Sequence, residues 1–295
     1  MRLLPMILVA ALAACRPAAS GVALPDKVPD AGTANGVRTS GCGVNGKPTG
    51  DFHLSVQDGQ GKARDFEVLV PTSYQATRPL QLTFVFHGAG GDESVAKSFG
   101  LQDAPGAAAA TIFVFPQGVS YRGGGIGWED SCASYDMIFF DRMLAALEAS
   151  YCLDASRVFI AGFSWGCDFG TAIVSCRGDR IRAFGAASCT DDFASQSDVS
   201  TYLNLPLQVI PKTAIRFTYD VAGDQAYSKA SFQSTSALYR SFNQCGNGST
   251  PAPTSPCVSY TGCRNPLIEC AYAGLGHALP AQWPGETWSF FSGLP

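Results

Sequence analysis

Apolar residues recur along this chain at two spacings, one typical of strands and the other typical of helices. Short runs that are rich in β-branched and aromatic residues and bounded by Pro and Gly predict strands. These runs are residues 64–70, 80–86, 111–115, 157–161, 183–187, 214–219 and 267–272. Apolar residues at helical spacing predict helices over residues 135–150, 165–176, 229–243 and 286–291.

Strands that alternate with helices are typical of an α/β protein with a doubly wound, mostly parallel sheet. The chain has 295 residues, enough for one large domain of this class or two small ones. No internal repeat or second domain is visible, so we expect a single domain over residues 42–295. The stretch 245–270 is rich in Pro, Ser and Gly and carries four cysteines, which predicts a disulfide-stapled surface loop.

The N-terminus has the pattern of a targeting segment. A basic residue precedes an apolar run, residues 3–14, that is too short to span a bilayer. The run ends in Leu-Ala-Ala-Cys, which resembles a bacterial lipobox. We therefore expect a signal peptide over residues 1–14 and an acylated Cys15, which would be the chain's only attachment to a membrane. The alternative is an ordinary signal peptide that is cleaved near Ala19 or Ser20.

The next residues, 15–41, are rich in Pro, Ala, Gly and Thr and show no apolar period, which predicts a flexible tether. Hydrophobic residues make up 46% of the chain and charged residues 15%, a composition typical of a packed globular protein. The net charge is −4 and no Lys/Arg cluster is visible, which argues against a nucleic-acid partner. We expect the protein to act as a monomer.

The cysteine content agrees with export. The chain has 11 cysteines, and an even set remains when Cys15 is set aside. In an exported protein such a set predicts up to about five disulfides. A zinc site is the alternative, but no Cys-x-x-Cys pair exists and the three histidines are scattered. We therefore expect disulfides and no metal.

The strongest chemical signal is the motif Gly-Phe-Ser-Trp-Gly at residues 162–166, between a predicted strand and a predicted helix. This is the context of a nucleophile elbow, in which small residues allow a sharp turn while Ser164 projects its Oγ into a cleft. The backbone N–H of Trp165 would point to where negative charge develops on the substrate. The motif predicts Ser164 as a nucleophile; the alternative is an ordinary Gly/Ser turn.

A serine nucleophile needs a base, and only His53, His87 and His277 exist. His53 precedes the predicted sheet, in a segment that we expect to be peripheral. His87 opens the motif His-Gly-Ala-Gly-Gly after a predicted strand, which resembles an oxyanion turn. His87 would then be structural, and the Ala89 N–H would be the second oxyanion donor. His277 lies in a glycine-flanked loop after the last strand, where the base falls in the chain order Ser, acid, His.

The acid should follow the strand 214–219, where Asp220 and Asp224 both qualify. We prefer Asp224, because it lies deeper in the loop and could turn back towards His277, hold the imidazole tautomer and stabilise the imidazolium. Asp191 and Asp192 come one strand too early and are expected to be solvated.

With these residues in place, the chain resembles the type C/D feruloyl esterases, relatives of polyhydroxybutyrate depolymerases and acetyl xylan esterases. The resemblance runs from Ser40 to Leu294, and its ordered motifs are more specific than any one of them. They are Ser40-Gly41-Cys42-Gly43, the His87 and Ser164 motifs, Phe99-Gly100-Leu101-Gln102, Phe115-Pro116-Gln117-Gly118, Gly127-Trp128, Phe140-Asp141, Met143-Leu144, Leu147-Glu148, Cys152-Leu153-Asp154 and Trp283-Pro284-Gly285-Glu286-Thr287-Trp288. The resemblance implies the α/β-hydrolase fold and an ester substrate.

The acid loop of this family usually reads His-Gly-x-x-Asp, which places the triad aspartate at Asp224. Here Asp220 and Val221 replace the family's histidine and glycine. Cys132 and Cys167 look additional to the pattern of the fungal members, and a bridge between them would tie the loop after Trp128 to the helix behind Ser164. The alternative for Cys167 is a small buried core residue.

These residues imply two-step acyl transfer through a covalent acyl-enzyme, with no metal or cofactor. Trp128 follows a glycine-rich stretch and, with His87, is a candidate for the substrate-binding wall; simple packing is the alternative. Feruloyl esters of plant-wall xylan are the first choice of substrate. Acetyl xylan and short polyesters are alternatives, because fold and triad do not fix the leaving group. A non-catalytic binding protein on a hydrolase scaffold is the alternative of another class, and the intact triad argues against it.

Overall fold

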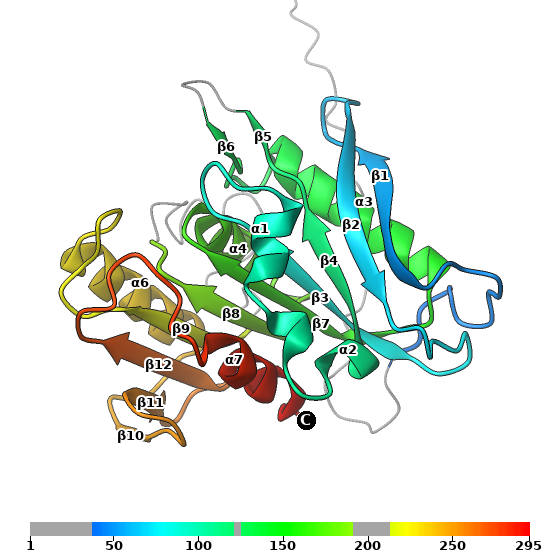
Figure 1. Ribbon diagram of the computed structural model, residues 1–295. Helices are drawn as coiled ribbons and strands as arrows, with labels where there is room; N and C mark the ends of the chain where they lie inside the picture. Colours follow the sequence, from blue (N-terminus) through cyan, green and yellow to red (C-terminus); the bar gives the residue numbers. More distant parts are fainter. Residues whose placement is uncertain (1–36, 121–124, 191–212) are drawn as a thin grey trace, which may run out of the picture. The chain divides into compact units, whose positions relative to one another are not determined.

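The computed structural model describes residues 37–120, 125–190 and 213–295. These residues lie in one compact unit that is built on a ten-stranded sheet (Figure 1). The expected signal peptide, Cys15 and most of the expected tether lie outside the described residues, as do Asp191 and Asp192. None of the described helices combines the length and apolar character needed to cross a bilayer.

The strands of the sheet follow the order β1-β2-β4-β3-β7-β8-β9-β12-β11-β10. From β4 to β12 in this order the neighbours are parallel, and towards both edges they are antiparallel. The strands are β1 (Gly50–Gln57), β2 (Ala63–Val70), β3 (Leu80–Phe86), β4 (Thr111–Pro116), β7 (Leu153–Phe163), β8 (Ala183–Ala187), β9 (Ala214–Asp220), β10 (Ser249–Pro251), β11 (Cys257–Tyr260) and β12 (Leu267–Tyr272). A separate ribbon pairs β5 (Val119–Ser120) with β6 (Ile126–Gly127).

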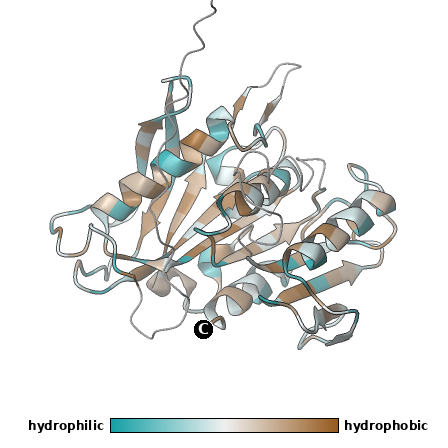
Figure 2. Cartoon of the chain, turned by 180° about the vertical axis from the view of Figure 1, so that it is seen from behind, coloured by the Kyte–Doolittle hydropathy of each residue, from teal (hydrophilic) through white to brown (hydrophobic). Residues whose placement is uncertain are grey.

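Helices cover both faces of the sheet, which confirms the predicted doubly wound α/β architecture. One face carries α1 (Glu93–Ser98), η1 (Leu101–Asp103), α2 (Ala107–Ala110) and α7 (Trp283–Ser292), in front in Figure 1. The other carries α3 (Tyr135–Ser150), α4 (Trp165–Arg177) and α6 (Lys229–Phe242), and Figure 2 shows this face from behind, with largely hydrophobic strands beneath the helices.

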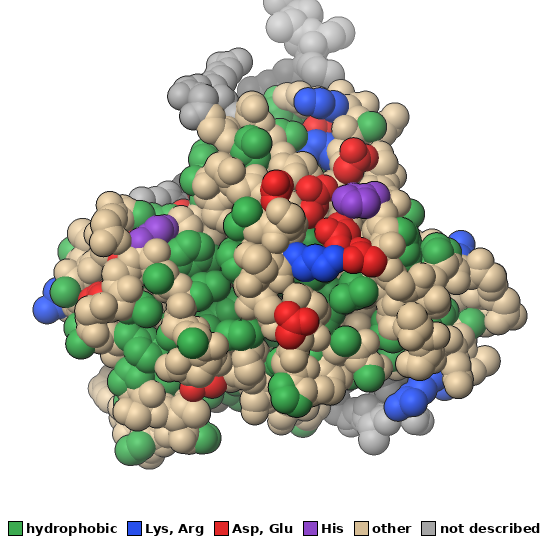
Figure 3. Space-filling view, in the orientation of Figure 1, with side chains coloured by type: hydrophobic (Ala, Val, Ile, Leu, Met, Phe, Trp, Pro, Cys, Tyr) green, Lys and Arg blue, Asp and Glu red, His purple; other side chains and the backbone are tan. Residues whose placement is uncertain are grey.

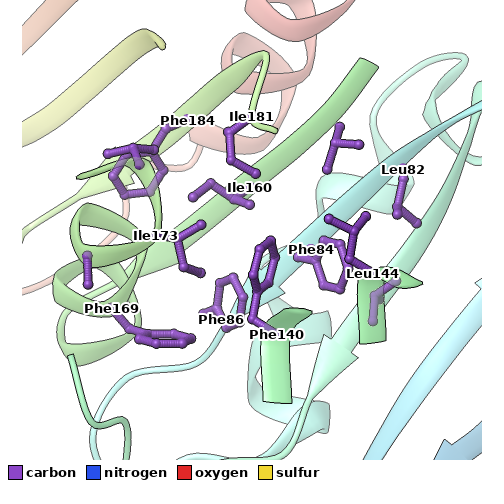
Figure 4. Packing of buried hydrophobic residues seen from close by; sticks show 14 of the residues in the cluster. Leu82, Phe84, Phe86, Phe140, Leu144, Ile160, Phe169, Ile173, Ile181 and Phe184 are labelled. Carbon is purple, nitrogen blue, oxygen red and sulfur yellow. The ribbon is translucent and has the colours of Figure 1, made fainter. Parts of the chain in front are cut away.

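The core is divided between the two faces because successive residues of a strand point in opposite directions. Phe84 of β3 packs in the cluster that contains α3 and α4 residues, whereas the next residue, Val85, packs with α7 residues. In the first cluster, Phe84 meets Phe140 of α3 with ring centroids 5.1 Å apart, and Phe86 meets Phe169 of α4 at 5.2 Å (Figure 4). These contacts anchor β3 and α4, the elements that lead into the His-Gly-Ala-Gly-Gly turn and out of the Ser164 turn.

The expected tether ends earlier than predicted. The Thr39 hydroxyl donates to the Tyr151 carbonyl at 2.7 Å, and the Gly41 N–H donates to the Glu148 carbonyl at 2.8 Å. A side chain at Gly41 would collide with the Tyr151 backbone, which explains the glycine there. Residues 39–41 therefore belong to the domain, and the predicted boundary at residue 41 is corrected.

The predicted sheet misses its edge strands. His53, which we expected before the sheet, lies on β1 with an exposed side chain. Only every second residue of β1 is half-buried, so its pattern is weaker than that of the central strands. The predicted loop 245–270 also contains β10 and β11, although the expected disulfide staples, Cys245–Cys263 and Cys257–Cys270, are present.

The five expected disulfides are present, but one expected pairing is wrong. Cys132 pairs with Cys176, and Cys167 pairs with Cys189, so the predicted Cys132–Cys167 bridge does not form. Cys167 and Cys176 both lie on α4, about two and a half turns apart, and therefore point to opposite sides of the helix. Cys176 meets the segment before α3, whereas Cys167 faces the end of β8. The remaining bridge joins Cys42 to Cys152.

Candidate active site

Ser164 lies on a strained turn between β7 and α4. Its backbone has φ 55° and ψ −131°, a left-handed φ that few non-glycine residues adopt. A side chain at Gly162 would collide with the Gly166 backbone, and one at Gly166 with the backbone of Phe86. The two glycines therefore let β7, α4 and the end of β3 approach closely, as the motif predicts.

The structure brings the three predicted triad residues together. The Ser164 Oγ lies 2.9 Å from His277 Nε2, and His277 Nδ1 lies 2.9 Å from Asp224 Oδ2. An ionised carboxylate only accepts hydrogen bonds, so Nδ1 carries the proton and Nε2 accepts from the Ser164 hydroxyl. The residues follow β7, β9 and β12, whose carboxyl ends meet at one edge of the sheet. The Asp224 side chain is 0% exposed and that of His277 is 23% exposed.

Asp224 and Asp220 have different surroundings. Burial raises the pKa of Asp224, but hydrogen bonds from Ser188, His277 and two backbone N–H groups outweigh it and leave the pKa below its usual value. Asp220 does not reach His277. Its Oδ2 accepts the Gly276 N–H at 2.8 Å and its Oδ1 accepts the Ala222 N–H at 2.9 Å, and the Gly276 bond is the main reason that its pKa is lowered. Asp220 thus braces the loop that carries His277.

Ser188 is a site residue that the sequence reasoning missed. Its hydroxyl donates to Asp224 Oδ2 and lies 3.0 Å from His277 Nδ1. It follows β8, and its φ of 49° turns the chain at the same sheet edge. A polar residue directly after a predicted strand at that edge was the available signal.

The predicted oxyanion turn lies beside the nucleophile. A Cβ added to Gly88 would lie 3.1 Å from the Ser164 Cβ, so only glycine fits without a shift at this approach. The Gly90 and Gly91 N–H groups donate to the carbonyls of Ile126 and Gly88. Among the described residues the Ala89 N–H has no such acceptor. Trp165 is the first residue of α4, directly after Ser164.

The expectation that His87 and Trp128 form a substrate-binding wall is wrong, because both are buried. The His87 Nε2 accepts the Gly118 N–H at 3.0 Å, so Nδ1 carries the proton and donates to the Gly88 carbonyl at 2.8 Å. Burial lowers the pKa of His87 and keeps it neutral. Trp128 is 1% exposed, stacks on Phe169 and donates its Nε1 hydrogen to the His87 carbonyl at 2.9 Å. Both residues therefore support the turn from behind.

A cavity of about 540 Å³ opens beside His277. Its lining is mainly apolar and comes from the α1–η1 segment and the chain between His277 and α7. Lining residues include Phe99, Phe163, Leu279, Pro284 and one carboxylate, Asp103. Figure 3 shows hydrophobic side chains gathered at the surface beside α1 and α7. This cavity therefore borders the imidazole on the side of α1 and α7.

The sheet order, the strained serine after the central strand and the acid and base after later strands define an α/β hydrolase. In the described ranges no group of three or more His, Cys, Asp or Glu side chains could hold a metal ion. The arrangement can activate a hydroxyl for attack on a carbonyl carbon, because a neutral imidazole accepts its proton.

Several curated relatives of this chain are named feruloyl esterases. The "Probable feruloyl esterase C" of Aspergillus niger is 24% identical over 281 residues, which cover 88% of this chain and 93% of the relative. The feruloyl esterase C of Emericella nidulans is 24% identical and covers 87% and 92%, respectively. The chain is therefore a distant homologue of feruloyl esterases over most of its length. No protein-family model matches it.

Solved structures show the same fold. The acetyl xylan esterase of Aspergillus awamori superimposes with a TM-score of 0.61 at 14% identity, covering 81% of this chain and 99% of that one. The feruloyl esterase module of Clostridium thermocellum, complexed with sinapinate, gives a TM-score of 0.51 at 12% identity and covers 82% and 85%. The α/β-hydrolase fold predicted from the sequence is confirmed.

Proposed function

We propose that this protein is an exported serine carboxylesterase that hydrolyses feruloyl esters of plant cell-wall polysaccharide. The observation that carries the proposal is the continuous hydrogen-bonded chain from Ser164 through His277 to Asp224. The substrate class comes from the relatives named feruloyl esterase C, whose likeness extends over most of both chains.

The geometry supports a two-step reaction. His277 Nε2, 2.9 Å from the Ser164 Oγ, takes the hydroxyl proton as Oγ attacks the ester carbonyl carbon. Negative charge then develops on the carbonyl oxygen, and the N–H groups of Ala89 and Trp165 are the donors that would bind it. His277 returns the proton to the leaving alcohol, and water, deprotonated by His277, hydrolyses the acyl-enzyme.

Asp224 and Ser188 prepare His277 for this role. The Asp224 carboxylate holds the Nδ1 proton in place and stabilises the imidazolium that forms when Nε2 takes the serine proton. Ser188 donates to Oδ2, the same oxygen that faces His277 Nδ1, while the backbone N–H groups of Ala226 and Tyr227 hold Oδ1, so the acid does not rotate away. The apolar cavity beside His277 would bind the aromatic part of a hydroxycinnamoyl ester.

The test compares the purified mature protein with Ser164→Ala on methyl ferulate, 4-nitrophenyl acetate and a short hydroxybutyrate oligomer. We expect methyl ferulate to have the highest kcat/KM and the variant to hydrolyse none of the three above background. A preference for the acetate or the oligomer would replace the feruloyl assignment by an acetyl esterase or a polyester depolymerase. A wild type that hydrolyses none of them would contradict the esterase proposal.

Export is the second part of the proposal. Five disulfides in the described part of the chain fit an oxidising compartment. We propose that residues 1–14 are removed and that Cys15 carries the lipid. Intact-mass spectrometry of the native protein tests this, and an unmodified N-terminus beyond Cys15 would rule out the anchor.

A further inference from the structure

Tyr227 links the loop of the proposed acid to the helix of the proposed nucleophile. Its N–H donates to Asp224 Oδ1 at 2.8 Å, and its carbonyl accepts the Asp224 N–H at 2.8 Å. Its hydroxyl donates to Asp168 Oδ2 at 2.5 Å. One residue therefore touches Asp224 through its backbone and helix α4 through its side chain.

Asp168 is fixed close to the nucleophile. It lies in the first turn of α4, and its N–H donates to the Ser164 carbonyl at 3.0 Å. Its Oδ1 accepts the Thr190 N–H at 2.8 Å, which ties the carboxylate to the segment that follows Ser188. Because α4 begins directly after Ser164, a shift of Asp168 would also move the Ser164 turn.

The side chain of Tyr227 also lies next to the reacting groups. Its ring centroid is 5.8 Å from that of the His277 imidazole. Burial and the nearby Asp168 carboxylate raise the pKa of Tyr227 well above its usual range. The phenol therefore stays protonated at neutral pH and donates to Asp168.

We propose that Tyr227, through its bond to Asp168, is a positioning residue that sets the distance between Ser164 and the His277–Asp224 pair. The inference rests on the proposed triad, whose members come from three separate loops with no direct covalent link. An error of about 1 Å in the placement of reacting groups can cost about 100-fold in rate. A bond that joins the acid loop to the nucleophile helix is a direct way to limit such errors.

The first test is Tyr227→Phe, which keeps the ring beside His277 and removes only the hydroxyl. The matched control is Tyr260→Phe, because Tyr260 on β11 also donates to a carboxylate, Glu269, at 2.8 Å. Three strands separate β11 from β7, the strand that leads to Ser164, so this bond lies away from the nucleophile. We expect kcat on methyl ferulate to fall about tenfold in Tyr227→Phe, with KM changed less than about twofold. The control should keep its kcat. A kcat within about twofold of wild type in Tyr227→Phe would overturn the proposal.

A double-mutant cycle with Asp168→Asn tests whether the two residues act as a pair. If they do, Tyr227→Phe/Asp168→Asn loses no more than the more impaired of the single variants. Losses that multiply would overturn the pairing. Thermal unfolding of each variant separates positioning from misfolding, because a purely structural role lowers the melting temperature of Tyr227→Phe without lowering kcat per active site.

A third test measures the rate at which a fluorophosphonate inactivates each variant. This test does not depend on the natural substrate, because the probe needs only an activated serine. We expect Tyr227→Phe to react about tenfold more slowly than wild type. If wild type reacts with the probe but does not hydrolyse methyl ferulate, the substrate assignment fails and the labelling rates still decide the role of Tyr227. A wild type that reacts with neither overturns both.

Discussion

The two segments that meet at Ser164 are held in place in different ways. The His-Gly-Ala-Gly-Gly turn after β3 rests on a buried layer in which Trp128 stacks on Phe169 and His87 is hydrogen-bonded through both ring nitrogens. The loops after β9 and β12 have more exposed residues and are held by carboxylates that accept backbone N–H groups. Substitutions on the first side should therefore mainly change stability, and those on the second side mainly kcat.

The largest expected effect separates the two aspartates of the acid loop. Asp224→Asn removes the charge that stabilises the imidazolium and should lower kcat by about 10⁴-fold. Asp220→Asn keeps the Asp224–His277 bond and weakens only the brace on Gly276, so its loss should not exceed about tenfold. Steady-state kinetics on 4-nitrophenyl acetate measures both. Equal losses in the two variants would contradict the assignment of Asp224.

Ser188→Ala should come next. The variant removes the hydroxyl that donates to Asp224 Oδ2 and leaves the triad residues intact. Hydrogen bonds to charged groups contribute about 1.5–3 kcal/mol to stability, so the melting temperature should fall. Because the Asp224 carboxylate is then held less firmly against His277, we expect kcat to fall about 10- to 100-fold. Full activity in Ser188→Ala would show that Asp224 keeps its position without the Ser188 hydroxyl.

On the other side of Ser164, Trp128→Phe should change stability and leave KM unchanged. The variant loses the bond from Nε1 to the His87 carbonyl, about 1 kcal/mol beyond the loss of ring volume. Trp283→Phe is the matched control, because the equally buried Trp283 Nε1 has no hydrogen-bond partner in the described structure. Denaturant unfolding of the two variants gives the difference. A raised KM in Trp128→Phe would instead indicate that Trp128 contacts the substrate.

The smallest expected effect is a pH dependence of stability. The pKa of Asp220 is lowered in the folded state, so the folded protein binds its proton less readily than the unfolded chain does. The stabilisation is complete above about pH 4, near the unfolded value, and is lost as the pH falls through the folded pKa. The free energy of unfolding should therefore fall less steeply below pH 4 in Asp220→Asn than in wild type. If the free energy of unfolding of the two proteins changed equally with pH, Asp220 would not stabilise the folded state.

Much of this arrangement follows from local sequence signals. Several central strands are rich in apolar residues because both of their faces are buried, so their pattern is strong. Ser164 and His277 stand out because their flanking glycines and their positions after strands are local features. The edge strand β1 is harder to predict, because only alternate residues are half-buried.

Other features depend on contacts that the sequence does not show. The pairing of Cys167 with Cys189 follows from the orientation of α4 over β8, which no spacing in the sequence reveals. The burial of Trp128 also follows from tertiary packing, since a tryptophan beside glycines can equally line a cleft. Ser188 becomes a site residue only because β8 lies between the strands that carry Ser164 and Asp224.

The proposed mechanism depends on the activation of Ser164 by His277. The most direct measurement is fluorophosphonate labelling of wild type and His277→Ala, read by peptide mass spectrometry. We expect one adduct, on Ser164, in wild type, and a loss of labelling by at least about 10³-fold in His277→Ala. An adduct on another residue, or equal labelling of the two proteins, would contradict it.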